Sequence, residues 1–399
     1  MSFWTIIAEQ AESRMNALLL RETWSHMASV SGFDPLCAAL GRCFEDAVFL
    51  YVPDAVPVVP QQSIKRRLVA RVFGRRSVQS PDYGVAPSPF VAARHEWAGR
   101  QVLEFAEQDR SAWIFLSAGE NQYGWALSQA PADIRRRVVM VAHQPPAWYR
   151  LNWRDFGVLQ GLGALICLSE EQAVFFESFC DSPVVRSRHG VCHDFFAPCG
   201  TEVGLGGEPR LLFVGGWLRD FGTLQAAMSE VWKKYPGVRL DCVVPREARN
   251  GTAVYLLARD PRVRWHAGIS PESLRELYQG ASLLFLPLLD STANNAIVEA
   301  MACGLPVVTS DVGGVAEYLP VEGGARCIPR DAAHHALAVL EWLGNPTRRA
   351  DASQPLRDVA VLRLDWTQIA AELAAELTDR FAANFTRGKK FRAAAKASD

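Results

Sequence analysis

The chain has 399 residues, 49% of them hydrophobic and 21% charged, which is typical of a compact folded protein and excludes disordered, collagen-like and coiled-coil classes. Its 42 Lys and Arg residues nearly balance its 43 Asp and Glu residues, so no net field draws it to nucleic acid. This length favours two domains with a cleft between them.

Membrane insertion and secretion are not expected from the sequence. The longest apolar stretches, such as Ala281–Leu289, are far shorter than a bilayer span, and Met1–Gln10 lacks the basic and apolar regions of a signal peptide. The nine cysteines form no CxxC pair and no zinc-like cluster with histidine, which favours reduced thiols. We therefore expect a cytoplasmic protein without a metal site.

Short strand-like apolar runs recur along the first half of the chain. In order, the predicted strands are Ala17–Leu20, Ala47–Tyr51, Trp113–Leu116, Val138–Ala142 and Leu165–Leu168. A segment rich in glycine and proline, Ala197–Pro209, then has the composition of a linker. We place the domain boundary in this segment.

In the second half, strands and helices alternate more regularly. The predicted strands are Arg210–Val214, Val238–Val244, Val263–His266, Ser282–Pro287 and Pro306–Ser310, and the predicted helices are Thr223–Lys234, Ser270–Gln279 and Ala296–Cys303. Such alternation predicts a doubly wound α/β domain with a parallel sheet. Asp365–Phe381 has the apolar spacing of an amphipathic helix.

A polar loop after the predicted strand that ends at Pro287 opens the next helix. It contains Asp290, Ser291, Thr292, Asn294 and Asn295. Unpaired N–H groups and the positive end of the helix dipole can receive a phosphate there. Glu299, inside the first turns, can accept hydrogen bonds from the vicinal hydroxyls of a ribose. The alternative is a carboxylate that merely complements the dipole.

Several motifs here resemble, in order, those of the retaining GT-B glycosyltransferases of family 4, also called glycosyltransferase group 1. Glu299–Val308 (EAMACGLPVV) is similar to the family's E-A-M-A-x-G-x-P-V-V, and Asp311–Glu317 (DVGGVAE) to its D-x-G-G-x-x-E turn. Three upstream segments also resemble the family: Val184–Pro198, Leu212–Gly216 and Ser270–Pro287.

The resemblance implies an α/β, GT-B fold of two Rossmann-like doubly wound domains that face a cleft. Residues 1–200 would form the acceptor-side domain, residues 201–364 the nucleotide-sugar domain, and residues 365–399 a helix that crosses back to the first domain plus a basic tail. It also implies sugar transfer from a nucleoside-diphosphate sugar to an acceptor hydroxyl with retention, in bacterial cell-surface or exopolysaccharide synthesis. The acceptor would be a glycan or a lipid-linked glycan, and no cofactor besides the co-substrate is implied.

By this resemblance, the donor contacts fall on the glycine turn and the polar loop: Gly215, Gly216, Arg219, Ala293, Asn294, Asn295 and Glu299. Ser291 stands where the family has its first glutamate near the donor sugar, so Ser291 or Asp290 takes that place. The family's diphosphate-binding Arg and Lys are missing, and Arg219 is the nearby cation. We expect Arg219 to bind charge on the leaving diphosphate, the alternative being a surface pair with Asp220.

In the first domain, His143 follows a predicted strand at the edge where doubly wound folds bind ligands. The family has a histidine there, near the point of sugar transfer, and it can hydrogen-bond the sugar or a phosphate oxygen. The alternative is a satisfied turn residue. Ser31 and Gly32 fall where the family has a glycine-rich loop that approaches phosphate or acceptor. Glu120 and Asn121 are expected to face the acceptor.

Lys65–Arg76 (KRRLVARVFGRR) surrounds apolar residues with six cations, and such a segment can lie on an anionic membrane surface. A solvated helix face is the alternative. Two other functions stay open. A non-catalytic protein that binds a nucleotide sugar or a partner is favoured by the missing glutamate and lysine. A nucleotide-sugar epimerase would need acid/base carboxylates at the sugar, where this chain has Ser291.

Overall fold

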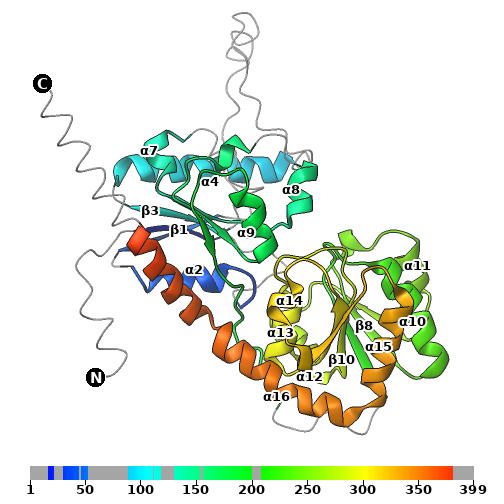
Figure 1. Cartoon of the computed structure of the whole chain (residues 1–399). Helices are drawn as coiled ribbons and strands as arrows, with labels where there is room; N and C mark the ends of the chain where they lie inside the picture. The colour runs from blue at the N-terminus through cyan, green and yellow to red at the C-terminus, as the bar shows by residue number, and fades with distance from the viewer. Residues whose placement is uncertain are drawn as a thin grey trace, which may run out of the picture.

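The structure, a computed structural model, describes residues 17–21, 30–44, 46–52, 89–110, 112–117, 130–152, 156–199 and 208–380. Each half of the chain forms one six-stranded parallel sheet with helices on both of its faces (Figure 1). The predicted α/β fold with two Rossmann-like units is therefore confirmed.

The first sheet has the strand order β2-β1-β3-β4-β5-β6. Its strands are β1 (Ala17–Arg21), β2 (Ala47–Tyr51), β3 (Trp113–Leu116), β4 (Val138–Val141), β5 (Ala164–Cys167) and β6 (Val184–Arg186). Its helices are α2 (Asp34–Gly41), α4 (Pro89–Gln108), α7 (Ala132–Arg135), α8 (Pro146–Asn152), η1 (Gly157–Leu159) and α9 (Glu170–Glu177). Leu18 and Leu20 lie in the apolar cluster on one face, while Ala17 and Leu19 lie in the cluster on the other, as the pleat requires.

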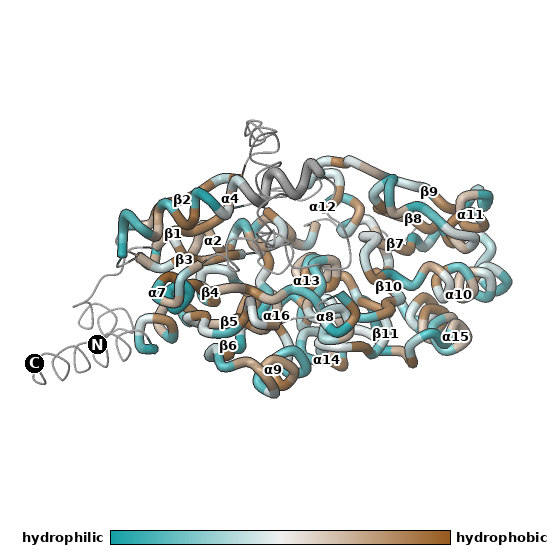
Figure 2. Tube along the Cα trace, turned by 90° about the horizontal axis from the view of Figure 1, so that it is seen from above, coloured by the Kyte–Doolittle hydropathy of each residue, from teal (hydrophilic) through white to brown (hydrophobic). Residues whose placement is uncertain are grey.

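The second sheet has the order β12-β11-β10-β7-β8-β9. Its strands are β7 (Arg210–Val214), β8 (Arg239–Val243), β9 (Val263–His266), β10 (Leu283–Leu286), β11 (Val307–Ser310) and β12 (Gly324–Cys327). Its helices are α10 (Phe221–Lys234), η2 (Arg246–Ala248), α11 (Thr252–Ala258), α12 (Pro271–Gly280), α13 (Asn295–Ala302), α14 (Val315–Tyr318), η3 (Val321–Gly323), α15 (Ala332–Gly344) and α16 (Pro346–Arg363). Figure 2 shows the strands of the two sheets side by side in these orders.

All ten predicted strands are present, with ends that differ by one residue at most positions. The prediction missed β6 and β12. Both are short edge strands, and β12 begins with Gly324, which has no side chain to contribute to a hydrophobic pattern. Several of the strands that were found, such as β3, β4 and β10, are buried along their whole length, which makes a parallel strand visible in a sequence.

Each sheet has one point where the order of strand addition reverses, between β1 and β3 in the first and between β7 and β10 in the second. Loops diverge at such a point and leave a crevice at the carboxyl ends of the strands.

Hydrogen bonds join the carboxyl ends of the strands of one domain to those of the other. Thr292 Oγ1, after β10, donates to the carbonyl oxygen of His143, after β4, at 2.5 Å. Trp217 Nε1, after β7, donates to Gln144 Oε1 at 3.0 Å.

A helix formed by residues 366–380 lies on the first sheet, directly after α16 on the second domain (Figure 1). Trp366, Ile369 and Leu373 are buried in the same apolar cluster as Leu19 and Trp113 of the first sheet. Leu356 and Ala360 of α16 belong to the apolar core of the second domain. The C-terminal segment therefore packs on both halves of the molecule.

Gly190 is required by this crossing. A Cβ atom at position 190 would lie 2.5 Å from the Trp366 ring and 2.9 Å from the Leu364 carbonyl oxygen. The next residue, Val191, donates its backbone N–H to that carbonyl at 2.8 Å. The chain that leaves the first sheet thus meets the chain that returns to it, with no space for a side chain between them.

A second contact between the domains lies beside β6. Glu317 of α14 accepts a hydrogen bond from the backbone N–H of Glu170 at 2.8 Å and pairs with Arg186 at 3.5 Å. The Tyr318 hydroxyl donates a hydrogen bond to the carbonyl oxygen of Leu168 at 2.8 Å.

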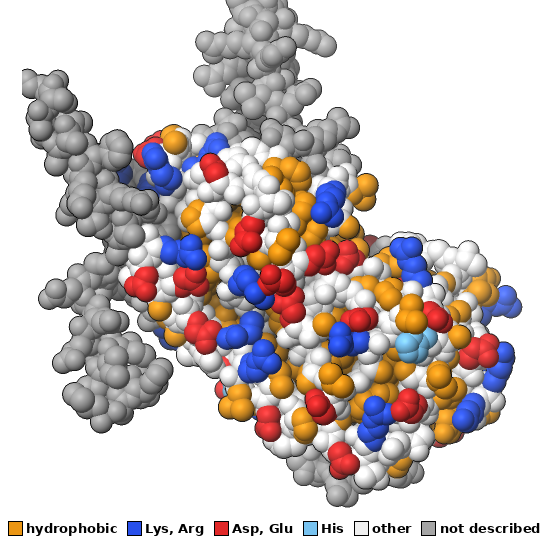
Figure 3. Space-filling model, in the orientation of Figure 1, with side chains coloured by type: hydrophobic (Ala, Val, Ile, Leu, Met, Phe, Trp, Pro, Cys, Tyr) orange, Lys and Arg blue, Asp and Glu red, His pale blue; other side chains and the backbone are white. Residues whose placement is uncertain are grey.

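Acidic and basic side chains are interspersed over both domains on the face in Figure 3, in keeping with the near-neutral net charge.

Within the described residues, no helix is long and apolar enough to cross a bilayer. All nine cysteines lie in the described ranges, and all are free thiols. The predicted membrane-contact segment, Lys65–Arg76, lies outside the described residues.

We predict that Trp366→Ala lowers the free energy of unfolding by about 3 to 5 kcal/mol, because it leaves a cavity between the C-terminal helix and the first sheet. Leu362→Ala, at an exposed position of α16, is the control. Urea unfolding of both variants measures the difference. Equal stability of the two would contradict the packing role of Trp366.

Candidate active site

The turn after β7 folds Arg219 back over its own glycines. Gly215 has φ +93°, and a Cβ there would lie 2.8 Å from Arg219 Nη2, so the glycine makes room for the guanidinium. Arg219 Nε donates to the Val214 carbonyl at 2.8 Å, Nη1 to the Trp217 carbonyl at 3.1 Å and Nη2 to Asn294 Oδ1 at 3.3 Å. Gly216 packs against Ala248, whose Cβ would be 2.4 Å from a Cβ at position 216.

Arg219 therefore lies at the reversal point between β7 and β10. Its surface pairing with Asp220, the alternative raised from the sequence, is wrong because the Asp220 carboxylate caps α10 and accepts from the Thr223 N–H at 2.9 Å and hydroxyl at 2.7 Å. Burial lowers the pKa of Arg219 to about 10, with nearby Tyr278 and Glu299 acting in the opposite direction. A guanidinium that has lost water without gaining an ion pair is a ready site for an anion.

The polar loop after β10 opens α13 as predicted. Asn294 is the N-cap, and its Oδ1 accepts from the Ala296 N–H at 3.1 Å as well as from Arg219. Asn294 thereby links the cation of the glycine turn to the start of the helix. The helix dipole adds to the positive potential at this end.

The two glycines of the D-x-G-G turn, Gly313 and Gly314, pack directly against the backbone of this loop. A Cβ at Gly313 would lie 1.8 Å from the Ser291 carbonyl oxygen, and one at Gly314 would lie 2.1 Å from the Thr292 carbonyl oxygen. The Gly314 N–H donates to the Ser291 carbonyl at 3.0 Å. Two motifs that are separate in the sequence thus form one packed unit, because only glycines admit the loop at this distance.

The remaining residues of the loop are held between the two halves of the molecule. Ser291 is buried at the start of the loop, where its N–H is bonded to Asp290 Oδ1 at 2.8 Å. Ala293 is half-buried and packs against the apolar clusters of both halves. Asn295, the first residue of α13, is half-exposed.

Glu299 is buried, with 4% of its surface exposed, and both of its oxygens accept hydrogen bonds. Ser31, from the first domain, donates to Oε1 at 2.7 Å, and Tyr278 of α12 donates to Oε2 at 2.9 Å. Burial raises the pKa of Glu299 from 4.5 to about 7, while the two hydroxyls and the charge of Arg219 oppose the rise. A buried carboxyl that lies between hydroxyl groups is suited to bind further hydroxyls.

On the first domain, His143 is half-buried directly after β4, and its carbonyl oxygen is bonded to Thr292. The edge of its ring meets Phe33 with 4.4 Å between ring centroids. Gly32, beside Phe33, has φ +69°. The structure therefore brings Ser31, Gly32 and His143 to the same edge as Glu299 and Arg219. Glu120 and Asn121 lie outside the described residues.

Three residues at this edge were missed by sequence reasoning: Tyr278, Trp217 and Phe33. Tyr278 is 1% exposed and looks like any core aromatic of an amphipathic helix, so nothing in the sequence marks its bond to Glu299. Trp217 did have a signal in the sequence, because it directly follows the predicted glycine turn. In the structure its side chain is 61% exposed. Exposed aromatic side chains beside a crevice are frequent in binding sites.

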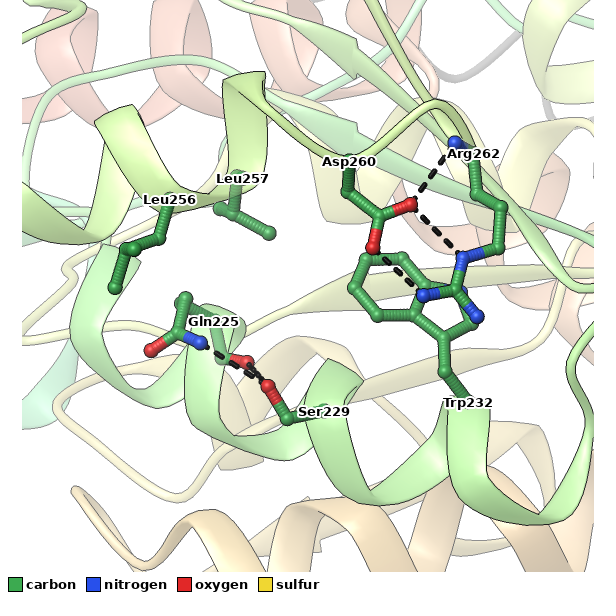
Figure 4. Close-up of a pocket in the computed structure, with 7 residues that line it drawn as sticks. All are labelled: Gln225, Ser229, Trp232, Leu256, Leu257, Asp260 and Arg262. Carbon is green, nitrogen blue, oxygen red and sulfur yellow. Dashed lines mark hydrogen bonds and ion pairs between the residues drawn. The ribbon is translucent and has the colours of Figure 1, made fainter.

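A second pocket lies away from this edge, between α10 and α11 (Figure 4). Its polar groups already bond one another: Arg262 pairs with Asp260 at 2.7 Å, and Gln225 donates to Ser229 at 3.0 Å. The Arg262 guanidinium carbon also lies over the Trp232 ring, 4.2 Å from its centroid.

Among the described residues, no group of three or more His, Cys, Asp or Glu side chains is placed to hold a metal ion.

We predict that Glu299 makes the protein less stable as the pH rises from 4.5 to 7, because the folded state keeps a proton that the unfolded state releases. Relative to Glu299→Gln, which cannot titrate, the wild type should lose roughly 3 kcal/mol over this range. Urea unfolding of both proteins across the range measures the difference. If the stability of the wild type relative to Glu299→Gln stays constant or increases with pH, burial does not raise the pKa of Glu299.

Residues 208–345 match the family described as "Glycosyl transferases group 1". Glycogen synthase from Mycobacterium tuberculosis is 28% identical over 175 residues, which are 42% of this chain and 42% of that relative. The matched stretch thus covers less than half of the relative's length.

The whole fold is similar to that of solved GT-B proteins. Sucrose-phosphate synthase from Thermosynechococcus elongatus superposes with a TM-score of 0.68 at 18% identity, over 93% of this chain and 100% of that one. Anabaena HepE, solved with UDP-glucose, superposes with a TM-score of 0.60 at 15% identity, over 92% of this chain and 99% of that one. Residues 208–345 therefore form a domain of the glycosyl transferases group 1 family, and the whole chain has the GT-B fold.

Proposed function

We propose that the chain transfers a sugar from a nucleoside-diphosphate sugar to an acceptor hydroxyl with retention of configuration. The observation that carries the proposal is the convergence of Glu299, Arg219 and the Asn294-capped start of α13 at the reversal point of the second sheet. A carboxylate, a guanidinium and a helix N-terminus match a ribose followed by a diphosphate. Each group has a counterpart on such a donor.

In this proposal the ribose hydroxyls bind Glu299, and the diphosphate lies between Arg219 and the positive end of the α13 dipole. Three of the five N–H groups of a guanidinium are engaged by protein acceptors in Arg219, which leaves two for phosphate oxygens. The sugar then extends toward His143 on the facing domain, past Ser291. When the bond between the sugar and the diphosphate breaks, the electron pair leaves with the diphosphate.

Arg219 and the helix dipole are the groups that stabilise this growing negative charge. We therefore propose a reaction that needs no metal ion, with His143 and Ser291 beside the sugar and Arg219 at the leaving group. UDP-glucose is the first donor to test, because HepE was solved with it. The acceptor side, with Ser31, Gly32, Glu120 and Asn121, is proposed to take a glycan or a lipid-linked glycan of a cell-surface or exopolysaccharide pathway.

For the domains, we propose residues 1–200 as the acceptor side, residues 201–364 as the donor side and residues 365–399 as the returning helix and tail. A reducing cytoplasm is proposed as the compartment, since nine free thiols suit it. Contact with the membrane through Lys65–Arg76 stays a prediction.

A second function is favoured by one observation. By the resemblance, Ser291 stands where the family has its first glutamate, and its hydroxyl brings no negative charge to the sugar. A protein that binds the nucleotide sugar without turnover would keep Glu299 and Arg219 and tolerate this change. Donor binding without transfer or hydrolysis would support this second function.

Glu299→Ala should weaken nucleotide binding by about ten- to a hundredfold, because two hydrogen bonds to a buried carboxylate are lost. Calorimetry with UDP, GDP, ADP and UDP-glucose measures the effect. Glu322→Ala, which removes an exposed carboxylate of the same domain, is the control and should bind as the wild type does. Wild-type affinity in Glu299→Ala would contradict the ribose assignment.

Arg219→Ala should lower kcat by about a hundredfold and change KM much less, since the charge it stabilises develops as the diphosphate leaves. Arg219→Lys should recover part of the loss, because an ammonium keeps the charge without the planar fork. Arg259→Ala, an exposed arginine after α11, is the control. Initial-rate kinetics decide the matter, and a loss confined to KM would assign Arg219 to ground-state binding.

A further inference from the structure

A segment of the first domain directly before α2, Val30–Phe33, reaches into the proposed donor site. Val30 packs against the apolar core of the second domain, and Ser31 donates its hydroxyl to Glu299 Oε1 at 2.7 Å. Gly32 turns the chain with φ +69°, and Phe33 then contacts His143, with 4.4 Å between the ring centroids. The loop therefore joins the carboxylate of one domain to the histidine of the other.

The two hydroxyls that bond Glu299 differ in their freedom to move. Tyr278 is 1% exposed and part of the core of the same domain as Glu299, so its hydroxyl is fixed. Ser31 is half-buried, comes from the opposite domain and stands next to a glycine in a left-handed conformation. A ligand that approaches Glu299 between the domains meets the Ser31 hydroxyl, and Ser31 is the partner that can withdraw.

We propose that Ser31 occupies the place of a ribose hydroxyl in the ligand-free protein, and that the donor nucleotide displaces it from Glu299 on binding. The inference rests on the proposed function and adds the means by which the ribose gains access. Because Glu299 is 4% exposed, a ribose cannot reach its oxygens while Ser31 stays in place.

The exchange adds one hydrogen bond at Glu299. The carboxylate loses one bond from a serine hydroxyl and gains two from the vicinal hydroxyls of a single rigid ring, so a ribonucleotide is favoured over the serine. A nucleotide without these hydroxyls has nothing to offer Glu299 in return. The Ser31 contact therefore multiplies the apparent affinity for ribonucleotides by the fraction of molecules in which it is open, and it makes displacement conditional on the diol.

The displacement also reaches the surroundings of His143, in the same domain as Ser31. Phe33 packs edge-on against His189 and Trp366 as well as His143, with centroid distances of 4.9 and 5.5 Å to the first two. Withdrawal of Ser31 moves a loop whose other end is anchored among these rings. Arrival of the ribose at one end of the donor site is thereby coupled to the surroundings of His143 at the other.

The test is calorimetric binding of UDP and of 2′,3′-dideoxyuridine 5′-diphosphate, with the guanosine and adenosine pairs run in parallel. Ser31→Ala should bind UDP, or the ribonucleotide that the wild type prefers, about tenfold more tightly than the wild type, because a hydrogen bond to a charged group no longer competes. Its affinity for the dideoxy compound should be unchanged. Ser31→Thr, which keeps the hydroxyl, should restore wild-type binding.

Glu317→Ala is the matched control for looser domain closure. It breaks a cross-domain hydrogen bond of 2.8 Å to Glu170 N–H that lies beside β6 and does not involve Glu299. If general loosening is the cause, Glu317→Ala and Ser31→Ala will shift both nucleotides alike, which would overturn the inference. Thermal melting of each variant confirms that it is folded.

The two proposals fail in different ways. Suppose that Glu299→Ala weakens ribonucleotide binding, while Ser31→Ala binds the ribonucleotide no more tightly than the wild type. This result overturns the role of Ser31 but leaves the proposed donor site in place. If no diphosphate binds the wild type or Ser31→Ala, the proposed function falls, and the role of Ser31 falls with it.

Discussion

A parallel sheet offers a ligand its backbone groups at one edge, the carboxyl ends of the strands, and both sheets of this chain turn that edge toward each other. The contacts of Thr292 with His143 and of Ser31 with Glu299 depend on this arrangement. It is held from outside by the C-terminal segment, which buries apolar residues on one sheet after the other. The site is thus a consequence of how two sheets are joined, and neither sheet forms it alone.

The chemistry of the site follows from incomplete solvation. Glu299 is buried and Arg219 is half-buried, and burial shifts the pKa of each in the direction that favours its neutral form. Neither is placed in a direct ion pair with the other. The second domain therefore holds a cation and a hydrogen-bond acceptor that are not paired with each other, and a ligand with a diphosphate beside a diol can bind both at once.

Much of the second domain could be predicted from its sequence, because strand burial and glycine turns are local properties. The loop after β10 and the start of α13 at Asn294 are examples. The bond from Tyr278 to Glu299 and the bond from Ser31 to Glu299 could not be predicted, since they span 21 and 268 positions of the chain. A partner that distant depends on helix packing and domain orientation, which leave no periodic signal. Arg219 was located, but its fold over Gly215 needed the structure.

The departures from the resembled family fall at Ser291 and at the glycine turn, while Glu299, the residue proposed to bind the ribose, matches the family's motif. A crystal structure with a bound nucleoside diphosphate tests this account most directly. We expect the ribose hydroxyls within hydrogen-bond distance of the Glu299 carboxylate, the diphosphate between Arg219 and the first turn of α13, and Ser31 withdrawn. A nucleotide bound elsewhere, with Ser31 still on Glu299, would contradict the account.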